Sequence, residues 1–553
     1  MGGQEPSSAG CSKSSNNSFK SLFRAYAERS SIKCLPRLIH AKSPLHKVLW
    51  FITFIVGGSV ASYLLSGLIR TYISYETTLS VTAKEGGKPP FPDITVCNLN
   101  PLWNNAPGWG FLAHVDGSPQ PLTYDEYIYM LFHNLEKLGQ TNNSVDITMP
   151  ELYSVSGYWK HTKHDSKSLD EMSKMFVWKC VWEKENQPYN CTVNATFTAT
   201  NGLCYTIRPP TGEGLAKKTR QEGMAVILYL NNTNIRFVAD YRLSPFQSYT
   251  EGVKVLLHPR GTVPEMVEGF TVSPGTEASV VAKYHRRLLL EKPYGTCKKK
   301  TDLNFSYIED TDIAWKYTEY ACRSLCYQNR IIEKCGCLDS TELVFDSLIK
   351  RYPFCSMFNL KNPKKALSEM NCTRSAKSYL DENNLCTMRC PTPCTNDVFY
   401  NTINQVTWPQ EVYLLGFYYT YVRPRPPSDE FKNYYDRAIG YAMVRNTSEA
   451  WHLVKSTDLL QKNFLQLSIT MADTITIDQD KPAIKIETIF GSLGGILNLW
   501  IGFTFITIME FVDLFLTIVL EKISASRVEA ADKKVTGNRE SKPEITMVEP
   551  FRL

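Results

Sequence analysis

Two long apolar runs near the ends of the chain stand out against an otherwise mixed pattern. The first extends from Val48 to Ile69 without a charged residue and lies between Lys47 and Arg70. About 20 consecutive apolar residues are enough for a helix to cross a bilayer. We therefore predict a transmembrane helix over residues 48–72. A buried core helix is the alternative, while a cleaved signal peptide is disfavoured because the run begins late and is too long.

The second run, over residues 487–520, stays uncharged from Thr488 to Met509 and then carries Glu510 and Asp513 before a last apolar stretch. Its length predicts a second transmembrane segment. A buried core helix is again the alternative.

Basic residues gather on the outer flanks of both runs, and lysine and arginine accumulate on the cytoplasmic side of a membrane. The pattern predicts a multi-pass plasma-membrane protein, in contact with membrane lipid, with both termini cytoplasmic. Its parts are a cytoplasmic region (1–47), the first helix, an extracellular domain (73–486), the second helix and a cytoplasmic tail (521–553). The flanking residues are Arg29, Lys33, Arg37, Lys42, Lys47, Lys522, Arg527, Lys533, Lys534 and Arg539.

Helical and strand patterns alternate between the two runs, which predicts an α+β ectodomain. Thr123-Tyr124-Asp125-Glu126 is a capping box, in which a hydroxyl and a carboxylate satisfy free backbone N–H groups at a helix start. A second helix is expected over Thr311–Cys335, and the tails Met1–Ser18 and Ser524–Leu553 have the pattern of disordered segments. Four β-rich runs predict strands, namely Ala225–Leu230, Val253–Leu257, Ser279–Tyr284 and Leu465–Thr470.

Cysteine is dense in one segment, since 14 of the 16 cysteines lie between Cys97 and Cys394. An even number of closely spaced cysteines is typical of an oxidised, extracellular disulfide framework. Cys322 and Cys326 share a spacing of four with Cys386, Cys390 and Cys394, so two antiparallel segments could be joined by rungs. Spacing alone leaves the pairing open.

Glycosylation sequons agree with an extracellular middle, although sequons also occur by chance. An eighth, Asn16, falls in the N-terminal tail and would go unused. The seven candidate sites in the middle are Asn142, Asn190, Asn194, Asn231, Asn304, Asn371 and Asn446.

Composition narrows the function classes. The 553 residues are 43% hydrophobic and 21% charged, which excludes a disordered or collagen-like chain. A net charge of +6 is too small and dispersed to indicate nucleic acid. An enzyme is not indicated, because HExxH and GxSxG motifs are missing and the histidines are scattered. No cofactor or metal is expected; zinc at Cys335-Gly336-Cys337 is the rival reading, disfavoured where thiols oxidise.

Glycines crowd the first half of the second apolar run, at Gly491, Gly494, Gly495 and Gly502. Each weakens a helix by about 1 kcal/mol relative to alanine. Close packing of small residues is one interpretation. The other is a helix that bends or unwinds where it lines a cavity, because non-helical backbone at membrane depth must be buried in protein or face water.

Glu510 and Asp513 favour the second interpretation, since they lie on one helix face and carboxylates inside a bilayer must face a polar interior. A structural ion pair, with Lys47 as the nearest basic residue, is the alternative. Rings of carboxylates select cations, so we predict a cation pore, which one such helix encloses only in an oligomer. A non-conducting bitopic receptor or adhesion protein is the alternative from another class, and it needs no carboxylates at that depth.

Several motifs together resemble the degenerin/epithelial sodium channel family over nearly the whole chain. Residues 91–100 (FPDITVCNLN) are similar to the signature after the family's first membrane helix, and Pro293-Tyr294-Gly295-Thr296-Cys297 to a second signature. The cysteine order after Cys297 matches throughout. Gly491 to Asp513 resembles the second membrane helix, with Gly502-Phe503-Thr504 at the Gly/Ser-x-Ser selectivity tripeptide.

The resemblance implies a trimer, with two further and most simply identical subunits, that encloses a sodium-selective, amiloride-sensitive pore below palm, ball, finger, thumb and knuckle regions. It implies an aromatic gating contact between Tyr75 and Tyr294, and places Gly491 at the degenerin position, where bulky side chains hold the pore open. It also implies the disulfides Cys97–Cys204, Cys180–Cys191, Cys297–Cys394, Cys322–Cys390, Cys326–Cys386, Cys335–Cys372 and Cys337–Cys355.

The chain departs from the family pattern at three pore positions. Lys33-Cys34 stands where the family has a cytoplasmic His-Gly, which puts the lower constriction in question. Thr504 replaces the third selectivity serine and adds a methyl group. Ser492 follows Gly491, where acid-sensing relatives carry aspartate.

Proton-sensing positions are also replaced, and carboxylate pairs sense protons because like charges raise one pKa. Proton gating is therefore disfavoured, while constitutive and mechanical gating stay open. The compact form is most similar to invertebrate peptide-gated sodium channels of the FMRFamide type. The residues at the proton-sensing positions are Glu76, Thr77, Gly261, Thr262, Arg374 and Ser378.

An FMRFamide-type peptide brings aromatic or long apolar side chains, an arginine and a free amino terminus, so its site should pair aromatic surface with carboxylate. The candidate is the capped helix in the finger region. The alternative is that the tyrosines pack against the ball and the acids favour the helix N-terminus. The candidate residues are Tyr124, Asp125, Glu126, Tyr127 and Tyr129.

Overall fold

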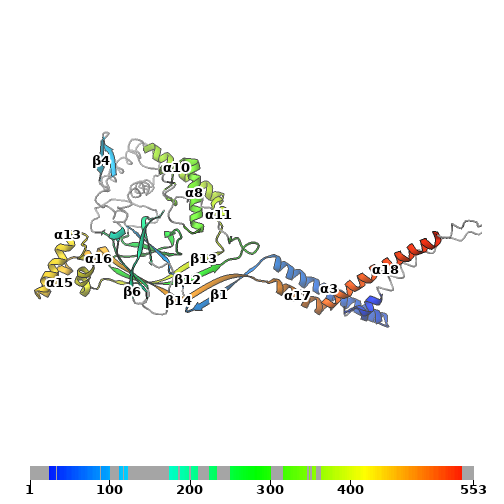
Figure 1. The fold of residues 1–553 in the computed structure, drawn as a ribbon. Helices are drawn as coiled ribbons and strands as arrows, with labels where there is room; N and C mark the ends of the chain where they lie inside the picture. Colours follow the sequence, from blue (N-terminus) through cyan, green and yellow to red (C-terminus); the bar gives the residue numbers. More distant parts are fainter. Residues whose placement is uncertain are drawn as a thin grey trace, which may run out of the picture. The chain divides into compact units, whose positions relative to one another are not determined.

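The computed structural model has two compact units, one of residues 1–78 and 482–553 and the other of Leu79–Lys481. Figure 1 traces the helices and strands of both units along the chain. The structure describes residues 24–32, 34–87, 89–99, 111–115, 118–122, 173–184, 187–198, 201–209, 223–232, 250–299, 315–339, 341–344, 348, 351–355 and 363–537.

Long helices build the first unit. Helix α3 (Pro44–Ile73) contains the first apolar run and begins after Ser43, whose hydroxyl accepts a hydrogen bond from the His46 N–H. The short helix α2 (Cys34–His40) precedes it. The second apolar run forms two helices, α17 (Ile486–Trp500) and α18 (Phe505–Gly537).

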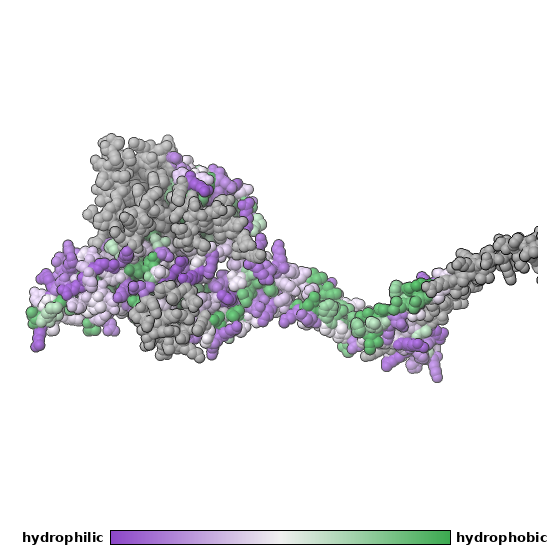
Figure 2. Space-filling view, in the orientation of Figure 1, coloured by the Kyte–Doolittle hydropathy of each residue, from purple (hydrophilic) through white to green (hydrophobic). Residues whose placement is uncertain are grey.

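Many apolar side chains of α3, α17 and the first part of α18 are exposed, and Figure 2 shows apolar surface over parts of this unit on one face. Helix α3 is long and apolar enough to cross a membrane, whereas α17 and α18 pass the same test only as a pair, bent by 77° at the break between them. Among the described residues there is therefore one clear span, or two if the bent pair is one span. The exposed side chains of α3 include Leu45, Val48, Leu49, Phe51, Ile52, Ile55, Val56, Tyr63, Leu64, Ile69 and Ile73.

The predicted break in the second run is present, and it lies at only one of the four glycines. The structure keeps residues 491–495 helical and breaks the helix at residues 501–504. A glycine in a helix costs only about 1 kcal/mol, whereas an unsatisfied backbone group in an apolar environment costs several. The helix instead ends at Gly502, whose φ of 79° is left-handed, the conformation in which glycine commonly terminates helices.

The prediction of a disordered C-terminal tail was wrong for its first part. Residues 524–537 continue α18 as a helix. The segment is rich in alanine, glutamate, lysine and arginine, which are good helix formers. Residues 1–18 and 538–553 of the predicted tails lie outside the described residues.

Two large sheets form the second unit. The larger has the strand order β13-β12-β14-β9-β5-β6, with β1 on β14; the smaller has the order β11-β10-β2-β8-β7, and β3 pairs with β4. The four predicted strands are confirmed as β9, β10, β12 and β14. The strands are β1 (Thr77–Glu85), β2 (Asp93–Asn98), β3 (Phe111–Val115), β4 (Ser118–Leu122), β5 (Val177–Lys184), β6 (Gln187–Asn190), β7 (Thr192–Thr198), β8 (Gly202–Arg208), β9 (Gly223–Tyr229), β10 (Val253–His258), β11 (Phe270–Val272), β12 (Thr276–Leu288), β13 (Thr395–Thr407) and β14 (Phe464–Pro482).

A single apolar core lies between these sheets. Val96 and Tyr205 from the smaller sheet and Val226, Val280 and Leu467 from the larger are all fully buried in it. Apolar residues alternate along β12, as expected for a strand with one face buried. The α+β prediction for the ectodomain is therefore confirmed.

Helices α8 (Glu319–Cys335), α10 (Pro363–Glu382) and α11 (Leu385–Arg389) lie side by side (Figure 1). The predicted start of the first at Thr311 was wrong, because Thr318 caps the helix by accepting from the Ala321 N–H at 3.1 Å. Residues 315–318 are not helical, and 311–314 lie outside the described residues.

Seven disulfides hold the second unit, and their partners are those that the family resemblance implies. The pairs Cys322–Cys390 and Cys326–Cys386 form an antiparallel ladder between α8 and the α11 segment, with Cα–Cα distances of 5.7 Å in both rungs. Cys335 and Cys337 are both disulfide-bonded. No free thiolate is left at that pair to bind zinc.

Short helices between β13 and β14 surround a second, aromatic core made by Phe417, Tyr418, Phe431, Tyr435 and Phe464. Phe464 begins β14, so this helical group packs directly on the larger sheet. The short helices of the second unit are η3 (Met266–Glu268), η4 (Glu411–Tyr413), α12 (Leu414–Phe417), η5 (Tyr418–Val422), α13 (Asp429–Phe431), η6 (Lys432–Asp436), α14 (Arg437–Met443), α15 (Thr447–Lys455) and α16 (Leu459–Asn463).

Candidate pore and gating sites

The tripeptide Gly502-Phe503-Thr504 is the non-helical link between α17 and α18. The Gly502 N–H donates to the carbonyl oxygens of Leu497 and Asn498, both at 3.1 Å, and the Phe503 N–H donates to Leu497 at 3.2 Å. The end of α17 thus satisfies the amides of the first two residues. Carbonyl oxygens are the backbone groups that replace a cation's hydration shell, so a tripeptide with its N–H groups tied back has the right chemistry for a filter.

Thr504, the third residue of the tripeptide, is hydrogen-bonded to Thr507 in the first turn of α18. The Thr504 N–H donates to the Thr507 hydroxyl at 3.1 Å, and Thr507 is fully buried although it lies in the first turn of α18. The first amides of a helix have no partner within the helix. Thr507 therefore supplies a hydrogen-bond acceptor to the amide of Thr504, the residue just before the helix.

Glu510 is held by the N-terminal segment 24–32. The Ser31 N–H donates to both carboxylate oxygens, at 3.0 and 3.2 Å, and the Ser31 hydroxyl lies 3.3 Å from one of them. The Tyr26 ring lies 5.3 Å from the Phe511 ring, and Ser30 is buried. Glu510 is thus a hydrogen-bond acceptor for its own chain, which sequence analysis missed because a separation of 479 residues leaves no local signal.

The two predicted pore carboxylates have different surroundings. Asp513 is exposed one turn along α18, while Glu510 is half-buried. Asp513 uses its backbone carbonyl to accept from the Thr517 hydroxyl at 2.8 Å. The ion pair considered for these acids does not form among the described residues, and Asp513 is the carboxylate with the freer side chain.

The glycines of the membrane helices divide into two kinds. A Cβ at Gly57 would lie 2.8 Å from the carbonyl oxygen of Trp500, so α3 packs closely on the end of α17 there. A Cβ at Gly491, the degenerin position of the resemblance, would meet no atom of the chain within 4 Å. Gly57 is therefore required for packing inside one chain, whereas Gly491 is not.

Two predicted gating sites stay predictions. Tyr75, with a φ of 52°, belongs to the first unit and Tyr294 to the second, so their contact is not tested. The five candidate peptide-binding residues from Tyr124 to Tyr129 lie outside the described residues, as does Lys33. Cys34 begins α2 with a free thiol.

Of the predicted glycosylation sites, Asn142 and Asn304 lie outside the described residues. Asn231 is half-buried, and its side-chain oxygen accepts a hydrogen bond from the Tyr229 hydroxyl at 3.0 Å. The exposed sites are Asn190, Asn194, Asn371 and Asn446.

Gly261 and Thr262, two of the positions considered for proton sensing, make hydrogen bonds within the fold. The Gly261 N–H donates to the Asp93 carboxylate at 2.9 Å, and Arg208 pairs with the same carboxylate at 2.8 Å. The Thr262 hydroxyl lies 3.0 Å from Nδ1 of His258. Burial lowers the pKa of His258 to about 4, so this histidine is neutral at ordinary pH.

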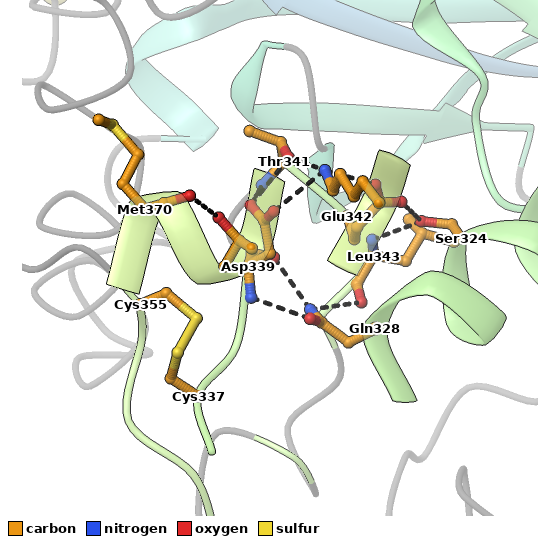
Figure 3. Close-up of polar contacts among 11 residues, drawn as sticks. Ser324, Gln328, Cys337, Asp339, Thr341, Glu342, Leu343, Cys355 and Met370 are labelled. Carbon is orange, nitrogen blue, oxygen red and sulfur yellow. Dashed lines mark hydrogen bonds and ion pairs between the residues drawn. A yellow bond between two sulfur atoms is a disulfide. The ribbon is translucent and has the colours of Figure 1, made fainter. Parts of the chain in front are cut away.

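A half-buried polar cluster fixes α10 to the loop after α8. The Lys377 ammonium lies 3.0 Å from Asp339 and 2.8 Å from Glu342. The Ser324 hydroxyl donates to Glu342 at 2.6 Å, as Figure 3 shows. Gln328 accepts from the Asp339 N–H at 2.9 Å. Burial alone lowers the pKa of Lys377, but the two carboxylates outweigh it and raise the pKa above its ordinary value.

Replacing Lys377 with methionine is expected to destabilise the α8–α10 region by roughly 2–4 kcal/mol. Two carboxylates whose side chains are only 13% and 15% exposed then lose their partner. The matched control is Lys365→Met on the same helix, since the Lys365 side chain is 72% exposed and pairs with Glu369 at 3.7 Å. An exposed pair contributes about 1 kcal/mol or less. Thermal melting of the purified full-length protein measures both; equal melting temperatures for the two variants would contradict the expectation.

Comparisons with known proteins identify the family and several related chains. The family described as "Amiloride-sensitive sodium channel" matches residues 26–514. The chain is 23% identical to the FMRFamide-activated amiloride-sensitive sodium channel of Cornu aspersum, over 91% of this chain and 84% of that protein. It is 23% identical to human acid-sensing ion channel 2, over 91% and 88% of the two chains. It is 21% identical to the epithelial sodium channel subunit alpha of Neoceratodus forsteri, over 94% and 82%.

Proposed function

Because this chain belongs to the amiloride-sensitive sodium channel family, we propose that it forms a sodium-selective channel opened by an extracellular FMRFamide-type amidated neuropeptide. The family consists of ion channels, which are membrane proteins and not enzymes. The observation that carries the pore is the non-helical link Gly502-Phe503-Thr504 between two apolar helices. Such backbone is tolerated at membrane depth only where it is buried in protein or faces water.

The proposed channel is a trimer of identical subunits, since one α17–α18 pair cannot enclose a pore. Sodium is the permeant ion, no cofactor takes part, and amiloride blocks the current. Gly502, Phe503 and Thr504 line the filter and Asp513 adds negative charge below it. In the proposed membrane orientation, both termini lie in the cytoplasm. The disulfide-linked unit lies outside the cell, where its disulfides are stable.

Peptide gating rests on the residues at the proton-sensing positions rather than on overall similarity. Peptide-activated and acid-sensing relatives are both 23% identical to this chain, which does not separate the two stimuli. Gly261 and Thr262, however, offer no carboxylate, and their backbone and hydroxyl groups are already bound within the fold. On α10, Ser378 donates to Glu382 at 2.9 Å instead of adding an acid of its own.

Two-electrode recording from oocytes that express this chain alone tests the proposal. Amidated FMRFamide-type peptides are expected to open an amiloride-blocked current whose reversal potential follows external sodium. A step to about pH 5, below the ordinary pKa of histidine, is expected to open little. A large acid current with silence toward every peptide would establish a proton-gated channel instead. A standing current, or one evoked by membrane stretch, would indicate constitutive or mechanical gating.

The candidate peptide site has its own control. Alanine at Asp125, Glu126 and Tyr127 is expected to weaken peptide potency. Alanine at Asp429, an acid whose side chain is 88% exposed, should leave potency unchanged. Unchanged potency in the triple variant would remove this site without touching the channel function. Absence of any current from a chain that reaches the cell surface would favour a non-conducting receptor or adhesion protein.

A further inference from the structure

Residues 259–263, here called the linking loop, lead from the smaller sheet to the helices around α8, and His258 at the end of β10 lies directly before them. We propose that His258 is a positioning residue that holds the linking loop against the start of α8. When extracellular acid protonates His258, the loop is released and the peptide-evoked current falls. Only the effect on current rests on the proposed channel function.

The linking loop is attached to the α8 region through both backbone and side chains. The Lys316 N–H donates to the Gly261 carbonyl oxygen at 2.7 Å, and Thr262 forms an isolated parallel bridge with Lys316, just before α8. Val263, the last residue of the loop, is buried in the same apolar cluster as Leu325 of α8. A shift of the linking loop therefore moves the start of α8.

Two buried side chains of the smaller sheet hold the linking loop from its other side. The Asp93 carboxylate, on β2, accepts from the Gly261 N–H at 2.9 Å and pairs with Arg208 at 2.8 Å. Nδ1 of His258 lies 3.0 Å from the Thr262 hydroxyl, and His258 lies opposite Asp93 across the two strands. Successive residues of the loop are thus anchored by facing residues of β2 and β10.

A chain of hydrogen bonds fixes His258 in one neutral form. The Thr262 hydroxyl donates to the Pro259 carbonyl oxygen at 2.7 Å, so it accepts from the Nδ1–H of His258. A hydroxyl has one hydrogen and a neutral imidazole has one N–H. Nε2 therefore accepts from the Thr95 hydroxyl, 2.9 Å away. In this form His258 is the donor that keeps Thr262 in place.

A proton on Nε2 of His258 conflicts with this chain of bonds. Both nitrogens of a charged imidazole donate, so Thr95 would have to turn its hydrogen toward Thr206, 2.9 Å away. Thr206 would then have to turn toward Thr196, at 2.7 Å. All of these side chains are buried, and a buried charge without suitable partners is costly. The proton therefore binds better once the loop has opened and His258 is exposed to water.

The direction of the pH effect follows from the two states of His258. Asp93 on β2 and Arg208 on β8 are the charged groups that act on it in the closed state. Burial lowers the pKa of His258 from 6.5 to about 4, while Asp93 and the Pro259 carbonyl raise it in part and Arg208 lowers it. With the loop released, the pKa returns toward its ordinary value. Acid therefore favours release as the pH falls from about 6.5 to about 4.

Hydrogen–deuterium exchange in the purified full-length protein tests the contact without any current. The Lys316 and Gly261 amides should lose about tenfold or more of their protection between about pH 7 and about pH 5, after correction for intrinsic exchange rates, because each unit of pKa difference is a tenfold change in an equilibrium constant. His258→Asn keeps a donor toward Thr262 but does not titrate, so its protection should not depend on pH. His452→Asn, which changes an exposed histidine on α15, is the matched control and should behave as the wild type does.

A second pair of variants separates positioning from a general loss of stability. Thr262→Val removes the acceptor for His258 and should leave the Lys316 amide poorly protected at every pH. Thr262→Ser keeps the hydroxyl and should restore both the protection and its pH dependence. Protection that does not change with pH in the wild type would overturn the proposal. The same pH dependence in His258→Asn would overturn it as well.

Recordings from oocytes test the effect on current. The current evoked by an amidated FMRFamide-type peptide is expected to lose about half or more of its amplitude between about pH 7 and about pH 5, because only channels with the loop in place respond. His258→Asn should keep its amplitude. An equal loss in the two proteins would overturn the role of His258 in gating. A pH-dependent contact in a chain that carries no current would establish the role of His258 in the fold and refute the proposed channel function together with the effect on current.

Discussion

Replacing Gly491 with phenylalanine is expected to give a channel that conducts without a ligand. A Cβ at this position meets no atom of its own chain within 4 Å, so α17 tolerates a side chain there. In the proposed trimer the new ring meets neighbouring subunits where closed helices crowd together. An overpacked contact costs about 1–3 kcal/mol, enough to raise the open population, and with it the resting current, about tenfold or more.

The control for Gly491 is a second glycine with the same surroundings in its own chain. A Cβ at Gly58, on α3, also meets nothing within 4 Å, and Gly58→Phe is expected to leave the resting current unchanged. Resting sodium current in oocytes, corrected for surface protein, compares the two. Wild-type resting current in Gly491→Phe would contradict the assignment. Thiol modification of Gly491→Cys that only blocks current would contradict it as well.

Replacing Gly502 with valine is expected to reduce sodium current per surface channel by about tenfold or more. Gly502 has a φ of 79°, and a β-branched residue is strongly disfavoured in that region. Such backbone strain costs about 1–3 kcal/mol. Valine relieves the strain by leaving the left-handed region, which breaks the two hydrogen bonds from the Gly502 N–H and moves the neighbouring carbonyl groups of the proposed filter.

A strained glycine outside the proposed pore separates this effect from a loss of stability. Gly336 ends α8 with a φ of 72°, and a Cβ there meets nothing within 4 Å. Gly336→Val therefore introduces similar strain, and it should lower the amount of surface protein but not the current per channel. Single-channel recording with surface labelling distinguishes the two variants. Normal unitary current and sodium selectivity in Gly502→Val would refute the filter assignment.

The local pattern of apolar and polar residues was enough to predict the helices and strands whose residues share one environment. The uncharged run Val48–Ile69 became α3, and the β-rich runs became β9, β10, β12 and β14, because hydrophobic period and length are properties of adjacent residues. The start of α8 needed more. Thr318 caps the helix, and just before it Lys316 forms an isolated bridge with Thr262, a contact that local sequence does not predict.

The broken helix shows how much of the second apolar run could be predicted from its composition. Glycine content predicted that the second apolar run would not be one straight helix, and the structure bends it by 77°. Composition did not give the position, because three closely spaced glycines remain helical while Gly502 does not. The position of the break is set by hydrogen bonds from the amides of Gly502 and Phe503 to the carbonyl groups of Leu497 and Asn498.

By itself the sequence determined the two apolar ends, the mixed helix and strand character between them, and an oxidised cysteine framework. Disulfide partners could not follow from spacing, and the contacts that matter most for the proposed pore could not follow either. Ser31 reaches Glu510 across 479 residues, and Lys377 finds Asp339 and Glu342 on a different segment. Period and propensity describe neighbours in the chain, whereas these partners are chosen by how helices pack and by the need of each buried polar group for a hydrogen bond.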